Sequence, residues 1–405
     1  MAVAAVVALT VLWSKHTKGS AVPTSSLTSA HHGDPRCVDV MLPVSVTSQN
    51  AVYDIVQIDT SIDAIAYALD MDSRSAPSIE ERILRNITVS DTYNIAAKLC
   101  ISRNGGKKNH LQIATHGGVF DSRYWDARIN PEEHSWVHNA LAAGYSILTY
   151  DRLGNGNSDK PDPYQVNQIP LALEILRGIT KIAREGHLMK YASPGSKQSK
   201  AQFDRIIHVG HSLGSAISLG MVTTYGNESD GAVLTGWTTT YQSTGGKTTT
   251  FDLQLASEND PKLFGDFPNG YAVPSTASAI QTGFFSTRRN HTVGIGGFTP
   301  ELLEYGNSIK SPIGAAELLS ATRLNLGLAP DFSGPIQFVL AEYDWLVCDG
   351  DCKGTTNMTL LEQLYPKATD INVYTQPGTG HGLPLHRGAN IGFKASFDWL
   401  DRNGL

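Results

Sequence analysis

A serine flanked by glycines is the first feature of this sequence that could do chemistry. Ser212 lies in Gly210-His211-Ser212-Leu213-Gly214, after the apolar run RIIHVG and before a segment of helical character. A serine hydroxyl is a weak nucleophile unless a base activates it, and a sharp strand-to-helix turn with nearby glycines exposes it. We therefore predict that Ser212 is a nucleophile. The backbone N–H of Leu213 would then face a developing oxyanion.

A histidine and an acid follow this serine in the order that a catalytic triad of this kind uses. Asp344 ends the strand-like run FVLAEYD, and His381 lies in the glycine-rich turn GTGHGLP. Parallel strands deliver the residues at their carboxyl ends to one edge of a sheet, where the three side chains are expected to meet. His381 would take the Ser212 proton and return it to the leaving group, while Asp344 would hold the tautomer.

Other residues compete for two of these roles. His386 lies five positions after His381, and His211 lies beside the serine. Further acids crowd the strand end that carries Asp344, namely Glu342, Asp349 and Asp351. The sequence leaves these alternatives open.

Two glycines after an earlier strand-like run predict the rest of an oxyanion site. In His116-Gly117-Gly118, which follows LQIAT, glycine lets the backbone approach a substrate closely. We expect the N–H of Gly118 to be the second oxyanion donor, with a plain tight turn as the alternative. The expected substrate-binding residues are neighbours of these motifs, namely Val119, Phe120, His211 and Trp345. Val119 and Phe120 could equally be core residues.

The elements that must position these residues alternate between strands and helices. Strand-like runs at LQIAT, YSILTYD, RIIHVG, GAVLTGW, PIQFVLAEYD and DINVYTQ are separated by helix-like segments. This rhythm predicts an α/β fold with a mostly parallel, twisted sheet and helices on both faces. We also expect strands over 38–47 and 92–102 and a short helix over 79–86.

The rhythm breaks over 238–330, which predicts a cap or lid inserted after the sixth strand. The two parts of the core are then 37–237 and 331–405. Residues 1–21 have the apolar run and polar flank typical of a secretory signal peptide, and 22–36 read as a flexible lead-in. Because no positive residue precedes the run, an uncleaved anchor or a mis-set start codon is the alternative. The run is too short to span a bilayer, so no stable membrane insertion is expected.

Composition excludes several partners. The chain has 405 residues, 41% of them hydrophobic, and a formal net charge of -6, without a Lys/Arg run dense enough to track nucleic acid. The segment DRLGNGNS at 151–158 lacks the endings of a P-loop or a dinucleotide-binding loop, and we interpret it as a structural turn. No Cys/His cluster has zinc spacing, so neither a metal nor a cofactor is predicted.

The four cysteines and four sequons fit a secreted protein. Four cysteines permit three pairings, of which we favour Cys37–Cys100 and Cys348–Cys352 because each pair lies within one neighbourhood of the predicted fold. The candidate glycosylation sites are Asn86, Asn227, Asn290 and Asn357, although such motifs also arise by chance.

Taken in order, these motifs resemble the serine α/β-hydrolase superfamily. The HGG turn, DRLGNGNS, GHSLGS, the acid after AEYD and the GTGHG histidine carry the resemblance. The pattern of Cys37 near VDVMLPVSV, with YNIAAKLC before the first core strand, is similar to secreted fungal members. The resemblance implies hydrolysis of esters, thioesters, lactones or amides through an acyl-enzyme without a cofactor. Epoxide hydrolases and haloalkane dehalogenases of this fold carry aspartate where Ser212 stands, which argues against both.

The leading hypothesis is a secreted carboxylic-ester hydrolase that acts on a small-molecule ester or lactone. An acyltransferase, lyase, peptidase or cofactor-free haloperoxidase with the same triad is the alternative, as in fungal specialised-metabolite pathways. A non-catalytic binding protein of the same fold is a third hypothesis.

Overall fold

The computed structural model describes residues 37–102, 107, 109–193, 201–241, 247–285 and 297–405. The predicted signal peptide at 1–21, the lead-in at 22–36 and the sequon at Asn290 lie outside the described residues. Within the described ranges, no helix has both the length and the apolar character needed to cross a membrane.

An eight-stranded sheet lies at the centre of the fold. Its strands in chain order are β1 (Cys37–Tyr53), β2 (Ile83–Cys100), β3 (His110–Thr115), β4 (Ser146–Tyr150), β5 (Arg205–His211), β6 (Gly231–Thr235), β10 (Ile336–Ala341) and β11 (Ile371–Gln376). The spatial order is β1-β2-β4-β3-β5-β6-β10-β11. The pairs from β4 to β11 are parallel, whereas β1, β2 and β4 pair antiparallel. The predicted α/β-hydrolase fold with a mostly parallel sheet is confirmed.

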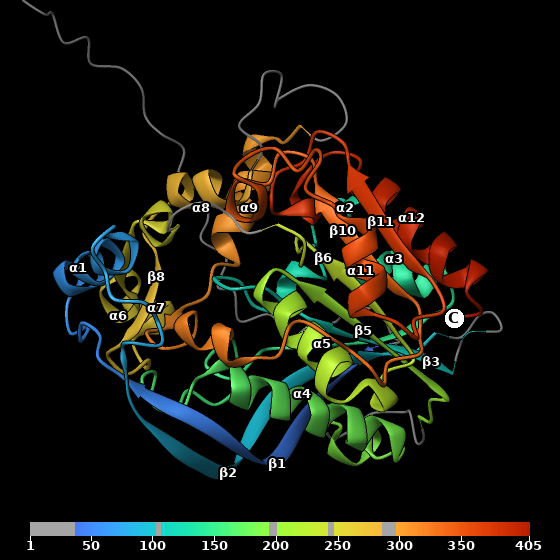
Figure 1. Ribbon diagram of the computed structural model, residues 1–405, viewed down its shortest axis with the longest axis horizontal. Helices are drawn as coiled ribbons and strands as arrows, with labels where there is room; N and C mark the ends of the chain where they lie inside the picture. The colour runs from blue at the N-terminus through green and yellow to red at the C-terminus, as the bar shows by residue number, and fades with distance from the viewer. Residues whose placement is uncertain (1–36, 103–106, 108, 194–200, 242–246, 286–296) are drawn as a thin grey trace, which may run out of the picture. The chain divides into compact units, whose positions relative to one another are not determined.

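Helices cover both faces of this sheet, and the side chains of the strands show why. Along β5, Ile206 packs with the residues of α4, whereas Ile207 packs with Trp136 and Phe397 on the opposite side. Successive strand residues point to opposite faces, so a strand buried on both sides is apolar throughout. The flanking helices are α4 (Ile169–Arg184) and α5 (Leu213–Thr224) on one face, and α3 (Trp136–Ala142) and α12 (Ala389–Arg402) on the other (Figure 1).

Shorter elements connect these layers. They are α2 (Pro131–His134), α10 (Trp345–Cys348) and α11 (Met358–Leu364), with the 3-10 helices η1 (Ser122–Tyr124), η2 (Leu188–Tyr191), η3 (Gly226–Glu228) and η6 (Leu383–Leu385). Among them, α10 matters most for the site, because it begins directly after Asp344.

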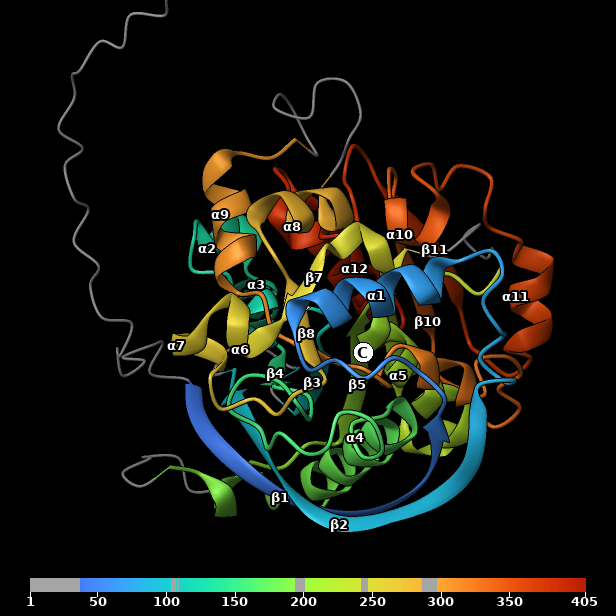
Figure 2. The ribbon, with the colours of Figure 1, turned by 90° about the vertical axis from the view of Figure 1, so that its left-hand side faces the viewer.

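The first two strands form a long antiparallel ribbon that curves beneath α4 (Figure 2). The ribbon corrects one expectation, because the short helix predicted over 79–86 is absent and β2 begins at Ile83. Three consecutive β-branched residues at 87–89 favour a strand, and β1 supplies the backbone partners, with Ile87 opposite Asn50. Cys37 lies directly opposite Cys100 in this ribbon.

A helix that the sequence analysis missed, α1 (Ser61–Asp72), connects the two strands of the ribbon. Thr60 and Asp63 form a capping box at its start, with the Asp63 carboxylate accepting from the backbone N–H of Thr60 at 2.9 Å. The buried Tyr67 of this helix donates its hydroxyl to the carbonyl oxygen of Ala315 at 2.6 Å. The helix therefore packs against the segment that connects β6 to β10.

The segment between β6 and β10 carries a second, three-stranded sheet and several short helices. Its strands are β7 (Leu253–Leu255), β8 (Tyr271–Pro274) and β9 (Ile313–Gly314). Its helices are α6 (Ala256–Asn259), α7 (Pro261–Phe264), α8 (Ala277–Phe284) and α9 (Pro300–Ser308), with the 3-10 helices η4 (Thr248–Phe251) and η5 (Leu319–Arg323). Figure 2 shows α1, β7 and β8 together, away from the long ribbon.

Candidate active site

Ser212 lies on the sharp turn between β5 and α5. Its φ is +53° and its ψ is −119°, a conformation that non-glycine residues seldom adopt. The two flanking glycines make this turn possible. A Cβ at Gly214 would collide with the carbonyl oxygen of Thr115, and one at Gly210 would collide with the backbone of Ser215. The turn therefore holds the serine partly exposed at the end of a strand.

The histidine and the acid form a buried, hydrogen-bonded pair. Nδ1 of His381 lies 2.7 Å from Oδ2 of Asp344, and both side chains are almost fully buried. The other carboxylate oxygen of Asp344 accepts the backbone N–H groups of Leu346 and Val347 at 3.0 and 2.9 Å. Because Nδ1 donates to the carboxylate, Nε2 carries the lone pair that a general base needs. Nε2 has no hydrogen-bond partner among the described residues.

Two ring contacts of His381 involve neighbours of Ser212. Its ring centroid lies 4.8 Å from that of His211, the neighbour of the serine. It also lies 5.4 Å from the ring of Phe284, which lines the same pocket as Ser212. The structure thus gathers the three predicted catalytic residues at one edge of the sheet.

A pocket of about 190 Å³ opens beside the serine. It is lined by Gly118, Val119, Ser212, Leu213, Lys247, Thr248, Phe251, Phe284, Ile313, Leu318 and Leu346. Both predicted oxyanion residues, Gly118 and Leu213, belong to this wall. Leu213 is the first residue of α5, where backbone N–H groups have no partner within the helix and attract an anion.

Comparison with known proteins identifies the family of this chain. A family model described as "Alpha/beta hydrolase family" matches residues 113–390, which include Ser212, Asp344 and His381. The chain belongs to the alpha/beta hydrolase family. No curated protein matches the hydrolase.

Solved structures with a similar fold include three enzymes of low sequence identity. An esterase from Thermogutta terrifontis is 15% identical over 77% of this chain and 94% of its own, with a TM-score of 0.48. A bromoperoxidase from Bacillus anthracis is 16% identical over 77% and 96%, with a TM-score of 0.48. An enol-lactonase from Burkholderia xenovorans is 12% identical over 76% and 97%, with a TM-score of 0.47.

The predicted substrate-binding residues of the hydrolase occupy different positions. Val119 lines the pocket and has a φ of +58°, which is strained for a β-branched residue. Phe120 and His211 are fully buried outside the pocket wall, where Phe120 packs on Phe284 and His211 stacks on Tyr124. Trp345 is 38% exposed and is not part of the wall.

The pocket also contains residues that the sequence analysis missed. Lys247, Thr248, Phe251, Phe284, Ile313 and Leu318 come from the segment between β6 and β10, and Leu346 comes from α10. The broken rhythm of that segment indicated an insert but could not indicate which of its side chains face the serine. Their positions depend on how the insert packs on the sheet.

One of the two competing histidines, His386, is held by hydrogen bonds to the turn that carries His381. His386 donates through Nδ1 to the carbonyl oxygen of Gly382 at 2.9 Å and accepts at Nε2 from the N–H of Gly380 at 3.1 Å. Its burial lowers its pKa to about 4. It therefore braces the turn that carries His381.

The competing acids also lie in contacts away from Nδ1 of His381. Glu342 accepts the backbone N–H of Gly378 at 2.7 Å. Asp349 forms an ion pair with Lys247 at 2.8 Å. The carboxylate of Asp351 accepts the backbone N–H of Lys353 at 3.0 Å and is exposed. Asp344 is the acid that the structure places against the histidine.

Hydrogen bonds of His116 and Arg152 stabilise the loop that carries Gly118. His116 accepts the backbone N–H of Arg152 at Nε2, 3.0 Å away, and donates to the carbonyl oxygen of Gly117. The burial of this ring holds the pKa of His116 well below its usual range. The Arg152 guanidinium also donates to the Gly117 carbonyl at 3.3 Å. DRLGNGNS thus contributes a structural support of the oxyanion loop.

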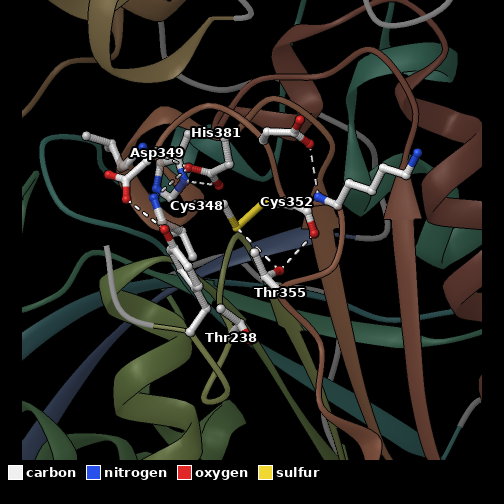
Figure 3. Close-up of a disulfide and its surroundings, with 12 residues drawn as sticks. Thr238, Cys348, Asp349, Cys352, Thr355 and His381 are labelled. Atoms are coloured by element: carbon white, nitrogen blue, oxygen red, sulfur yellow. Dashed lines mark hydrogen bonds and ion pairs between the residues drawn. A yellow bond between two sulfur atoms is a disulfide. The ribbon is translucent and has the colours of Figure 1, made fainter. Parts of the chain in front are cut away.

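Both predicted disulfides are present in the hydrolase. Cys37–Cys100 ties the start of β1 to the end of β2, and Cys348–Cys352 closes a short loop after the acid. Figure 3 shows the second disulfide with Asp349 and His381 close by. This disulfide therefore constrains the loop that directly follows α10, the helix that begins after Asp344.

The candidate glycosylation sites that the structure describes lie at the surface. The sequon residues Asn86, Asn227 and Asn357 are exposed. Asn357 also caps α11, because its side-chain oxygen accepts the N–H of Leu360 at 3.0 Å.

Within the described part of the chain, no group of three or more His, Cys, Asp or Glu side chains could hold a metal ion.

Proposed function

We propose that this hydrolase cleaves carboxylic esters or lactones of small molecules through an acyl-enzyme on Ser212. The observation that carries the proposal is the buried Asp344–His381 pair, whose Nε2 has no hydrogen-bond partner among the described residues, together with a serine held on a strained turn. This combination of an oriented base and an exposed hydroxyl is what nucleophilic catalysis by serine needs.

The mechanism follows from these positions. Ser212 Oγ attacks the carbonyl carbon while Nε2 of His381 takes its proton, and the Asp344 carboxylate stabilises the imidazolium that forms. The N–H groups of Gly118 and Leu213 donate to the oxyanion. His381 then protonates the departing alkoxide, which leaves an acyl group on Ser212. A water molecule, deprotonated by His381, repeats the sequence and releases the acid with the serine restored.

The pocket supports a small acyl group rather than a long lipid chain. Its volume of about 190 Å³ is below the roughly 300–1,000 Å³ of sites for drug-sized ligands. Apolar side chains such as Phe251, Phe284 and Ile313 supply much of its wall. Burying an alkyl chain against them would contribute binding energy in proportion to the area removed from water.

We also propose that residues 238–330 act as a cap and that the enzyme is secreted. The cap role is supported by the lining residues that this segment contributes to the pocket, Lys247 and Phe284 among them. Secretion is supported by the two disulfides, because such bonds persist mainly in oxidising compartments. The resemblance to secreted fungal members remains a prediction.

Labelling with a fluorophosphonate probe and peptide mapping tests the function. We expect the label on Ser212, its loss on heat denaturation, and a fall in turnover of p-nitrophenyl butyrate by about 10³-fold or more in Ser212→Ala. Ser218→Ala is the matched control, because this serine is buried in α5 and its hydroxyl has no partner among the described residues. Unchanged turnover in Ser212→Ala would reject the nucleophile. A folded protein that takes no label would instead favour the binding-protein hypothesis.

A further inference from the structure

One charged residue, Lys247, lines the pocket beside Ser212. Lys247 lies directly before η4, and the remaining described lining residues are uncharged. The Lys247 side chain is only 18% exposed. A buried charge is costly unless it is paired and hydrogen-bonded, so the contacts of this ammonium group decide what it can do.

Two contacts hold the ammonium group of Lys247 in place. Nζ lies 2.8 Å from Oδ1 of Asp349 and 4.1 Å from the ring centroid of Trp345. The other carboxylate oxygen of Asp349 accepts the hydroxyl of Tyr241 at 2.9 Å. The ion pair and the cation–π contact therefore fix the position of the lysine head.

Asp349 lies in the short loop that follows the predicted triad acid Asp344 and α10. It lies between Cys348 and Cys352, with a φ of +54°, inside the ring that the disulfide closes. The backbone N–H groups of Cys348 and Gly350 both donate to the carbonyl oxygen of Asp344, at 3.2 and 2.8 Å. Figure 3 shows the disulfide of this loop with Asp349 and His381 in its surroundings. The loop that orients the base thus also orients Lys247.

The backbone next to Lys247 is anchored from the opposite side. The N–H groups of Thr248 and Thr249 donate to the carboxylate of Asp72 at 3.1 and 2.7 Å. Asp72 is the last residue of α1, which packs on the same segment. The lysine is therefore preorganised before a substrate arrives, which lowers the entropy cost of any hydrogen bond that it donates.

We propose that Lys247 is a specificity-determining residue that donates a hydrogen bond to an uncharged oxygen of the substrate, remote from the scissile carbonyl. The inference rests on the proposed function and names its substrate class: esters that carry a second carbonyl group on an aliphatic chain. An ammonium group has three N–H donors, and the bond to Asp349 uses one of them. Because Asp349 balances the charge, a neutral carbonyl oxygen suits the site better than a carboxylate.

Matched ester pairs test this preference. The wild-type enzyme is assayed on p-nitrophenyl pentanoate, hexanoate and heptanoate and on their 4-oxo, 5-oxo and 6-oxo counterparts. A second pair, hexyl butyrate and 5-oxohexyl butyrate, places the ketone on the alcohol side. In at least one pair we expect kcat/KM to be about tenfold higher for the oxo ester, the size expected of one charge-assisted hydrogen bond.

Variants attribute the preference to Lys247. In Lys247→Met the ratio of kcat/KM for the oxo ester to kcat/KM for its parent ester should fall to about 1. The double variant Lys247→Met with Asp349→Asn leaves no unpaired charge, and its ratio should also fall to about 1. Asp349→Asn alone leaves the ammonium unbalanced, so it should raise relative kcat/KM for mono-p-nitrophenyl adipate, which carries a carboxylate. Lys394→Met, at an exposed lysine of α12, should retain the wild-type ratio.

The outcomes separate this inference from the proposed function. Ser212-dependent turnover with a wild-type ratio of about 1 in every pair overturns the role of Lys247 and leaves the hydrolase intact. A preference for oxo esters that survives in both Lys247 variants also overturns the role of Lys247, because the Lys247–Asp349 ion pair then only stabilises the structure. Absence of Ser212-dependent turnover on every ester overturns the proposed function and this inference with it.

Discussion

Arg152 and Glu317 form a buried ion pair that joins the loop after β4 to the segment between β6 and β10. The two side chains are 2% and 1% exposed. The same guanidinium donates to the carbonyl oxygen of Gly117, next to the predicted oxyanion donor Gly118. One arginine therefore connects the insert to the loop that is expected to stabilise the oxyanion.

We predict that Glu317→Ala lowers the free energy of unfolding by about 3–5 kcal/mol, because it leaves a buried guanidinium uncompensated. Urea unfolding measures this change. Asp398→Ala, in the exposed pair of Lys394 and Asp398, is the control and should cost less than about 0.5 kcal/mol. The double variant Arg152→Met with Glu317→Leu should recover most of the stability but not kcat, since the Gly117 carbonyl has lost a donor. A cost below about 1 kcal/mol for Glu317→Ala would contradict the buried pair.

The choice of acid gives a second prediction. Asp344→Asn should lower kcat on p-nitrophenyl butyrate by about 10³–10⁴-fold, because the amide no longer selects the tautomer with a free Nε2. Asp351→Asn, in the same loop but exposed, should stay within about threefold of wild type. Circular dichroism checks that both variants fold. If Glu342→Gln were inactive while Asp344→Asn kept most of its turnover, the assignment would be wrong.

The two disulfides should differ in what they contribute. Cys37–Cys100 joins residues 63 positions apart, and Cys348–Cys352 joins residues four apart. Loop-closure entropy then predicts a loss of about 4 kcal/mol on replacing the first pair with alanine and about 2 kcal/mol for the second. The second replacement should lower kcat more, because its loop contacts Asp344 through the backbone N–H of Gly350, which donates to the Asp344 carbonyl oxygen. Denaturant midpoints and kcat measure the two effects, and four free thiols in the denatured, unreduced protein would show that neither bond forms.

Buried histidines predict that the protein loses stability in mild acid. Burial lowers the pKa of His208 to about 3 and that of His386 to about 4, below the ordinary 6.5. Below pH 6.5 these histidines are protonated in the unfolded chain but stay neutral in the folded protein. The free energy of unfolding is therefore highest above pH 6.5 and falls as the pH decreases. Each such ring contributes a slope approaching roughly 1 kcal/mol per pH unit.

Denaturant unfolding between pH 7 and pH 5 measures that slope. His208→Gln should reduce the slope of the free energy of unfolding against pH by the contribution of one titrating histidine, whatever its effect on the stability at pH 7. A slope of zero in the wild type, or one that His208→Gln leaves unchanged, would show that the rings are protonated in the folded state.

The main chemistry of the site could be predicted from the sequence because it depends on local geometry. The turn at Ser212 needs glycine at 210 because a Cβ there would meet the backbone of Ser215, five residues later, whereas Gly214 makes room for the carbonyl oxygen of Thr115 in β3. The order of Asp344 and His381 along the chain follows from the strands that precede them. The apolar runs of β3, β5 and β10 predicted the parallel sheet because each strand is buried on both faces.

Other features depended on contacts between distant parts of the chain. Residues 83–86 became strand rather than helix because β1 supplied backbone partners. Glu342, Asp349 and Asp351 stayed open as alternatives to the predicted Asp344 until a hydrogen bond placed Asp344 against His381. No local pattern could place Lys247 in the pocket, because its position depends on the loop of Asp349 and on α1. Sequence alone determined the features set by steric limits within a few residues, whereas packing of distant segments decided which side chains meet.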